Sequence, residues 1–249
     1  MTPGRFAVRF PQLFLGLGAI AAGLVLGAGA LRDGLSARGR QDMITVTGSA
    51  RRSIVSDTVV WRASLTSTQA VPADAAKELG AWVGRVQAFL RSNGAADTEV
   101  RLEPIGTETI PELGPDGRAE TGRVGGYKLT RAFEVRSSRV KEITDIVQKS
   151  SALLNEGIPL TAQPPQYLYA ALPQLRPDLL ADASRDAKTR ADRLVAAAGG
   201  RLGRLQSVSA GVFQITAPGS TDTSGEGVYD TSTIDMDVTA VVNLTFAMG

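Results

Sequence analysis

The sequence contains no histidine and no cysteine. Without imidazole or thiol side chains, Ser-His and Cys-His nucleophilic catalysis are excluded. Zinc sites built on thiolate or imidazole ligands are excluded as well. Disulfides cannot form, so cysteine usage says nothing about the redox compartment. What remains is carboxylate chemistry, Ser-Lys chemistry, or binding without chemistry. The sequence therefore designates no catalytic residue, no cofactor-binding residue and no metal ligand, and we expect no cofactor.

The chain also lacks a strong charge bias and is poor in aromatic residues. It has 27 basic and 25 acidic residues, a net charge of +2, and only 5% aromatic residues. A single-strand nucleic-acid surface combines basic and stacking aromatic side chains, and no such cluster is found in the sequence. We therefore expect no nucleic-acid partner. The 249 residues are enough for a domain with a substantial core.

One long uncharged run lies near the start of the chain, over residues 13–31. Nineteen helical residues span roughly 28 Å, close to the hydrocarbon thickness of a bilayer. A signal-peptide core is usually shorter, about 7–15 residues, although Ala28-Gly29-Ala30 has the form of a cleavage site. We predict a retained single-pass membrane anchor over residues 1–35, with a cleaved signal sequence as the alternative. A polar linker over residues 36–42 and a domain over residues 43–249 follow.

Charges around this run leave its orientation open. Arg5 and Arg9 precede it, but Arg32, Arg38 and Arg40 follow it, so the positive-inside rule does not favour a cytoplasmic N-terminus. Glycines 23 and 27 have the spacing of a helix-pairing motif, yet small residues are common in any membrane span. Arg51-Arg52 and the three arginines before them could contact anionic lipid, but a solvated juxtamembrane segment is the simpler interpretation.

Apolar spacing predicts the first half of the domain. Alternation predicts strands and three-to-four spacing predicts helices. The expected strands are 43–47, ending at Gly48, then 54–66, 99–105, 127–135 and 167–172, and the expected helices are 73–92 and 138–150. Residues 111–126 and 217–230 are rich in glycine and polar residues and are predicted to be hairpin loops. The order from residue 54 to residue 172 is β-α-β-β-α-β, the order of a ferredoxin-like unit. The predicted fold class is α+β, an antiparallel sheet packed by helices.

An alanine-rich helix and two strands are predicted to complete the domain. Pro177 suits a first helical position, and Gly199-Gly200 ends the helix. Its predicted buried stripe is Leu180, Ala183, Ala187, Ala191, Leu194 and Ala198. Strands 205–216 and 234–246 follow. The second alternates without a break, so we predict a principal strand with Asp235 and Asp237 on its wet face and an overhang where subunits could pair.

Four short segments, in order, resemble the SIMPL domain family. They are Ile44-Thr-Val-Thr-Gly48, Gly126-Tyr127 opening a strand, Pro165-Gln-Tyr-Leu-Tyr169, and the alanine helix followed by AAG, LG and a strand. The resemblance implies a bacterial envelope protein, exported or membrane-anchored, often self-assembling and in some cases linked to stress tolerance. It implies an inner-membrane protein with its C-terminal domain in the periplasm, or a secreted periplasmic form after signal cleavage. It brings no catalytic residues.

Three candidate sites have simpler explanations. Ser138 and Lys141 have Ser-x-x-Lys spacing, but an N-cap serine beside an exposed lysine explains them. Asp222, Glu226 and Asp230 share one loop and could together bind calcium. Their spacing fits no EF-hand, and solvated loop charges are the simpler explanation. The third candidate is a ligand-stacking surface formed by the tryptophans at positions 61 and 82. Both lie on apolar faces, so they are expected in the core.

Three functions follow from the sequence. The first is a non-catalytic, membrane-tethered scaffold that assembles into homo-oligomers. The second is a peptide- or lipid-binding module of the cell envelope. The third, which has the least support, is a hydrolase that uses carboxylates or a Ser-Lys pair.

Overall fold

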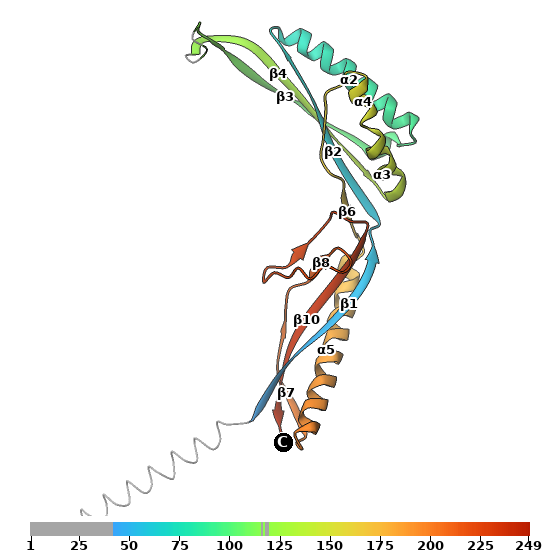
Figure 1. Cartoon of the computed structure of the whole chain (residues 1–249), viewed down its shortest axis with the longest axis vertical. Coiled ribbons are helices and arrows are strands. Elements are labelled where there is room, and N and C mark those ends of the chain that lie inside the picture. The colour runs from blue at the N-terminus through green and yellow to red at the C-terminus, as the bar shows by residue number, and fades with distance from the viewer. Residues whose placement is uncertain (1–41, 116, 118–119) are drawn as a thin grey trace, which may run out of the picture. The chain divides into compact units, whose positions relative to one another are not determined.

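The structure is a computed structural model that describes residues 42–115, 117 and 120–249. The predicted anchor over residues 1–35 lies outside the described residues. Among the residues that are described, no helix is both long and apolar enough to span a bilayer. The chain divides into two compact units, and the elements are drawn in Figure 1. The described part of unit 1 is 42–46, 188–208 and 244–249, and unit 2 is 47–187 and 209–243.

One sheet lies entirely within unit 2. Its strands are β2 (Thr58–Gln69), β3 (Val100–Leu113), β4 (Glu120–Ser137), β5 (Leu160–Ala162) and β6 (Gln166–Leu168). The order is β3-β4-β2-β5, with β6 also paired to β2, and every pairing is antiparallel. The helices α2 (Pro72–Ser92) and α3 (Val140–Lys149) cover one face, while η1 (Asp97–Glu99) and α4 (Ala152–Asn155) are short connections. The predicted order β-α-β-β-α-β matches the main elements of this sheet, except that two short strands, β5 and β6, take the place of the last strand.

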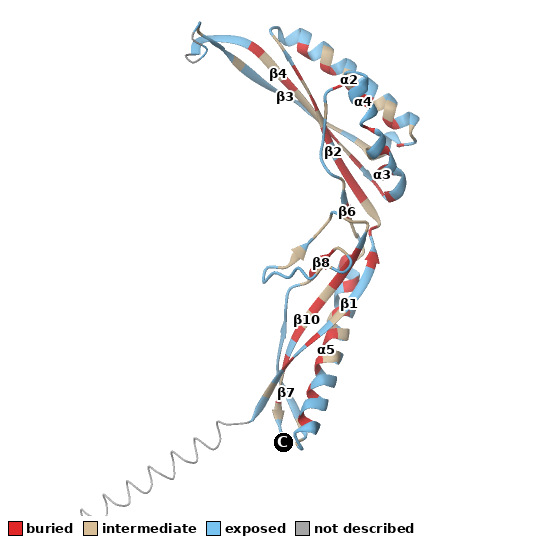
Figure 2. Ribbon diagram, viewed as in Figure 1, coloured by how far each residue is buried: buried red, intermediate tan, exposed pale blue. Residues whose placement is uncertain are grey.

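The core of this sheet lies beneath the two helices. Trp61 and Leu65 on β2 are fully buried, and Leu79 on α2 and Ile143 on α3 are buried against the same face. The Trp61 and Phe133 rings meet edge to face with centroids 5.5 Å apart. The expectation that the first tryptophan is a core residue is confirmed, whereas Trp82 is only half-buried. The alternating strand residues supply the inner face, as Figure 2 shows.

The second sheet contains β1 (Met43–Val55), β10 (Asp235–Met248), β8 (Gln214–Thr216) and β9 (Val228–Tyr229) in the order β1-β10-β8-β9. Strand β7 (Leu202–Ala210) also pairs with β10. The long helix α5 (Leu172–Ala197) packs on this sheet. Strands β1 and β10 run antiparallel, because Met248 N donates to Asp42 O at one end and Ser56 N donates to Ile234 O at the other. The prediction that β10 is a principal strand is confirmed.

The sequence predicts a single sheet. This prediction is wrong, because the strands form two sheets. Residues 54–66 do not form one strand: β1 ends at Val55 and β2 begins at Thr58. Around the break, Ser56 N donates to Ile234 O and Asp57 N donates to Leu168 O, so the two residues bond to different sheets. Gly48 does not end a strand either. It lies in the middle of β1, where the glycine permits close packing of α5.

Other predicted boundaries also need correction. The expected loop 111–126 is mostly strand, since β3 and β4 pair as far as Leu113 and Glu120. Cross-strand pairing outweighs the glycines and prolines there. The expected strand 205–216 divides into β7 and β8, and strand 167–172 shortens to β6 because α5 begins at Leu172. Pro177 therefore lies inside the helix, one turn after its start.

The buried stripe of α5 is right in its middle and wrong at its ends. Ala183, Ala187 and Ala191 are fully buried, but Leu194 is 56% exposed and Ala198 is exposed. The stripe continues instead through Leu179 and Val195, in steps of four residues. Steps of four advance by slightly more than one turn, so the stripe rotates around the helix. A twisted sheet requires such a rotation from a long helix that packs on it.

Candidate functional site

A buried carboxylate lies between β1 and β10, within unit 2. The Asp237 side chain is 3% exposed and forms an ion pair with the Arg51 guanidinium. Its second oxygen accepts a hydrogen bond from Ser53 Oγ at 2.6 Å. Both donors are on β1, the neighbouring strand of the sheet, and lie two residues apart, so their side chains share one face. The prediction that Asp237 faces solvent is therefore wrong.

The hydrogen bonds keep this carboxylate ionised. Those from Arg51 and then Ser53 lower the pKa of Asp237 below its ordinary value, against the effect of burial. The backbone N–H of Gly219 also contributes to the lowered pKa. A general base works best with a pKa near the operating pH. Because Asp237 is more acidic than usual and its oxygens are already bonded, it is suited to holding strands together and poorly suited to accepting protons.

A second buried polar residue holds the loop that follows β8. Gln214 is only 9% exposed, and its amide nitrogen donates to Ser224 O at 2.7 Å. Its amide oxygen accepts from Val228 N at 2.8 Å. The side chain thereby replaces backbone partners that the irregular segment would otherwise lack. Gln214 fixes the far end of this loop, while Asp237 holds its beginning at Gly219.

The loop and the strands line an open pocket of about 410 Å³ within unit 2. Apolar and small residues form part of its wall, among them Val212 and Val241. Loop hydroxyls and the Arg51 guanidinium supply the polar groups, together with the Asp222 carboxylate. Pockets of this size and mixed lining suit small ligands or short peptide segments.

The structure does not bring the sequence candidates into catalytic arrangements. Ser138 and Lys141 are both exposed, and no hydrogen bond joins them within the described chain. Ser138 is not the N-cap either: Arg139 occupies that position, and its N–H donates to Ser137 Oγ at 2.9 Å. The expected cap is therefore displaced by one residue.

Asp230 and the arginine pair have local partners instead. Asp230 accepts a hydrogen bond from Ser232 N at 2.8 Å, and bonds from Ser232 lower its pKa. Within the described parts of the chain, no group of three or more acidic residues is placed to hold a metal ion. Arg52 pairs with Asp182 on α5 at 3.2 Å. Arg51 and Arg52 are thus engaged with the domain itself.

Sequence reasoning missed Asp237, Ser53 and Gln214. Each looked like an ordinary polar residue of a strand or loop, with no motif around it. Only the pairing of β1 with β10, which are separated by most of the chain, places Asp237 beside Arg51. One available signal was that Asp237 lies within a long alternating strand, near its start, where a charge needs a partner if it is buried.

A comparison with family models agrees with this architecture. The SIMPL model, described as a protein of unknown function (DUF541), matches residues 44–246. The chain belongs to the SIMPL family. The match begins inside β1 and ends inside β10, so the SIMPL region includes both sheets. No curated protein matches the chain.

Proposed function

We propose that this SIMPL protein is a non-catalytic scaffold of the cell envelope, tethered to the membrane through residues 1–35, and that its domain self-assembles. The observation that supports self-assembly most is the edge strand β7. Eight of its nine residues are exposed, and only Leu202 is half-buried. In Figure 2 the strand is almost entirely in the exposed colour. Within the described chain β10 is the only strand that pairs with β7, so the other edge of β7 has no neighbouring strand.

An unpaired edge of this kind is a template for another strand. Proteins that avoid edge pairing place proline, lysine or a bulge on the strand. β3, the edge of the other sheet, has both Pro104 and Pro111 and an irregular register. β7 contains neither proline nor lysine, and Leu205 and Val208 are 48% and 58% exposed. The contrast favours β7 over β3 as the edge that accepts a second copy. The predicted overhang of β10 is less suitable, because that strand already has neighbours on both sides.

The test is the mass of the full-length protein in detergent, measured by light scattering across a concentration series. We expect an oligomer. Leu205→Lys adds a charge to the edge and should shift the protein towards monomer. Leu154→Lys is the matched control, because Leu154 is 56% exposed on α4 and should not affect assembly. A parent chain that is monomeric at every concentration would rule out self-assembly.

The tether and the location are tested separately. Full-length protein should remain in the membrane fraction after a carbonate wash and keep its residues before Leu31. A mature N-terminus at Leu31 would indicate signal cleavage and a secreted periplasmic form. A reporter fused after residue 249 should be active only on the periplasmic side. A role in envelope stress tolerance would require that a deletion strain grows poorly under envelope stress.

The pocket beside Arg51 favours a second candidate function, a module that binds peptide or lipid. A partly exposed guanidinium beside apolar wall residues could receive a carboxylate or phosphate attached to an apolar chain. Native mass spectrometry of the protein purified from bacterial membranes would detect a retained ligand. Val241→Trp should fill the pocket and remove the extra mass, whereas a protein without bound ligand would favour the scaffold alone.

A further inference from the structure

The near-neutral charge of the chain conceals two units of opposite sign. The described residues of unit 1 include five basic side chains, Lys188, Arg190, Arg193, Arg201 and Arg204, against two acidic ones, Asp42 and Asp192. Unit 2 has 17 basic and 22 acidic residues. Unit 1 therefore has a positive field and unit 2 a negative one. Such segregation affects which surfaces each unit approaches.

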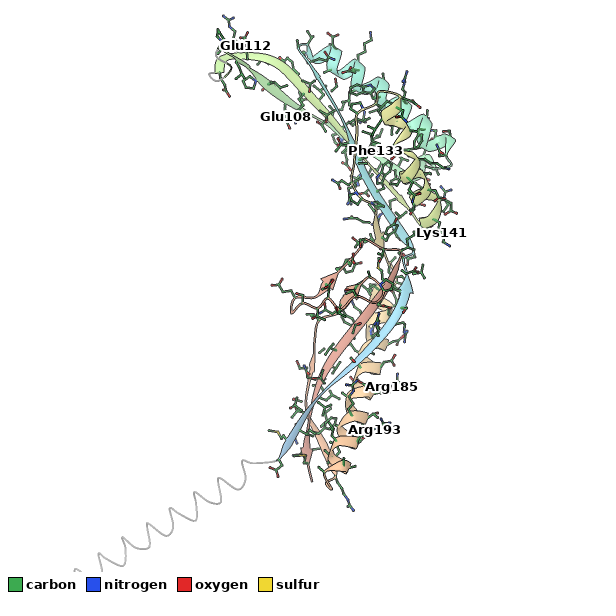
Figure 3. All side chains as sticks on the ribbon, viewed as in Figure 1. Glu108, Glu112, Phe133, Lys141, Arg185 and Arg193 are labelled. Carbon is green, nitrogen blue, oxygen red and sulfur yellow. The ribbon has the colours of Figure 1, made fainter. Side chains whose placement is uncertain are left out.

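Three of the unit 1 arginines are well placed to bind anions. Arg193, Arg201 and Arg204 are exposed, and none forms an ion pair with another described residue. Arg193 is on the exposed side of α5 (Figure 3), and the other two follow the end of that helix. Arginine presents a fork of N–H donors that matches phosphate oxygens.

Exposed apolar side chains occur in the same unit. Met43, Leu194, Leu205 and Met248 are between 41% and 59% exposed. Met248 N donates to Asp42 O, and Arg201 and Gly249 exchange two backbone hydrogen bonds. The start of β1, the end of β10 and the start of β7 therefore meet at one end of unit 1. Basic and large apolar groups together are typical of a surface that lies on a bilayer.

The chain reaches unit 1 directly from the hydrophobic run. Residues 32–42 separate Leu31 from the start of β1 at Met43. Eleven extended residues span at most about 40 Å, so a run inserted in a bilayer keeps Met43 within that distance of it. Three of these residues, Arg32, Arg38 and Arg40, are also basic.

We propose that unit 1 docks on the surface of an anionic phospholipid bilayer, an inference that rests on the proposed tether. Arg193, Arg201 and Arg204 bind the lipid phosphates, and the apolar side chains enter the headgroup region. The acidic unit 2 is repelled by the same surface. Each arginine near an anionic surface contributes about fivefold to a docking equilibrium, so the three together contribute about a hundredfold.

The test uses the absence of cysteine, which allows one fluorescent label at a chosen site. Ala198 is exposed just after the last turn of α5. In the Ala198→Cys variant, an environment-sensitive label is attached to the introduced cysteine, and the full-length protein is reconstituted into vesicles. The vesicles are phosphatidylcholine alone or phosphatidylcholine mixed with phosphatidylglycerol. We expect a blue shift and quenching by headgroup-labelled lipid only in the mixed vesicles. Raising salt from about 0.1 M to about 1 M shortens the screening length from about 10 Å to about 3 Å and should abolish the signal.

Two controls make the result specific. Replacing Arg193, Arg201 and Arg204 by glutamine should abolish the signal, whereas replacing Lys77, Arg85 and Lys141 of unit 2 by glutamine should not. A label at Ala88 on α2 should report no lipid contact. An equal signal in neutral vesicles, or in detergent through contact with a second copy, would overturn the proposal. So would a triple arginine variant that behaves like the parent.

Failure of the tether gives a different result. Protein that leaves the vesicles on carbonate washing lacks the tether, whatever the label reports. Protein that stays with the vesicles but shows no lipid-dependent signal has the tether and lacks the docking surface. If the tether fails, preformed vesicles added to the released protein test the surface alone, and loss of the phosphatidylglycerol-dependent signal there overturns the inference.

Discussion

A Cβ atom on Gly48 would lie 2.2 Å from the carbonyl oxygen of Ala183, closer than real Cβ contacts allow. It would also lie 2.6 Å from the Ala187 Cβ. Gly48 is required for space, because β1 and α5 have their backbones almost in contact there. We predict that Gly48→Ala moves the helix off the sheet and lowers the free energy of unfolding by about 3 kcal/mol or more. Urea denaturation of the purified protein measures this change.

Gly80 provides the matched control. It lies in the exposed part of α2, where an added Cβ meets no atom within 4 Å. Alanine is a better helix former than glycine by about 1 kcal/mol. Gly80→Ala should therefore stabilise the protein slightly. If the two variants shift the urea midpoint alike, the close contact at Gly48 does not determine the packing.

The alanine stripe predicts a second packing effect. Ala187 is fully buried, so Ala187→Leu should overpack the contact with the sheet and cost roughly 1–3 kcal/mol. Arg193→Leu, on an exposed part of the same helix, should cost little. Thermal melting of both variants checks the prediction. Equal shifts would mean that the helix packs through another face.

The middle of this helix was predictable because three alanines at four-residue spacing leave one interpretation. Its ends were not, since the stripe follows the twist of a sheet that the sequence does not describe. Gly48 shows the same limit. Locally, a glycine after a short alternating run indicates the end of a strand, and only the helix packed above it explains why the strand continues. Local spacing gave the type of most elements, and long-range packing set their boundaries.

The candidate site depended even more on distant contacts. The sequence correctly indicated that most of the segment after β8 is polar and irregular, although the predicted loop 217–230 contains β9, which pairs parallel with β8. It did not indicate that Gln214 and Asp237 hold the loop at its two ends, because both residues are inconspicuous in their own segments. The division into two sheets at Ser56 and Asp57 was missed for the same reason, since it depends on which strand each residue bonds to.

Gln214 should control the order of the loop after β8. Gln214→Leu keeps a similar side-chain volume but leaves Ser224 O and Val228 N without that partner. We predict faster cleavage after Glu226, the only glutamate between residues 217 and 230, by a glutamate-specific protease. Gln163→Leu is the control, because that side chain is exposed. Equal cleavage rates in the two variants would show that backbone pairing alone holds the loop.

Glu99 should make the stability depend on pH. Hydrogen bonds from Arg139 and then Ser137 lower the pKa of Glu99 from its ordinary 4.5 to about 2. The Ser137 Oγ lies 2.6 Å from Glu99 Oε1. Because the unfolded chain binds the proton more readily, this contribution is complete above about pH 4.5 and is lost as the pH falls towards about 2.

The measurement is the urea midpoint at about pH 6 and about pH 2.5. Glu99→Gln should reduce the difference between the two midpoints. It should not abolish it, because the pKa values of Glu78 and Asp237 are also lowered by hydrogen bonds. The exposed Glu156→Gln should leave the difference as in the parent chain. An unchanged difference in Glu99→Gln would mean that its hydrogen bonds persist in the unfolded state or do not form.

Two adjacent residues of β10 test which face of that strand is buried. Val242 is 1% exposed, and Asn243 is exposed with its side-chain oxygen accepting from Thr47 Oγ1 at 2.6 Å. Val242→Asp buries a carboxylate without a partner, so it should cost about 3 kcal/mol or more or prevent folding. Asn243→Asp keeps the acceptor oxygen and should be nearly neutral. Circular dichroism melts of the two variants decide the point: if both melt alike, β10 is not the central strand of its sheet, and the pairing that places Asp237 beside Arg51 would need to be redrawn.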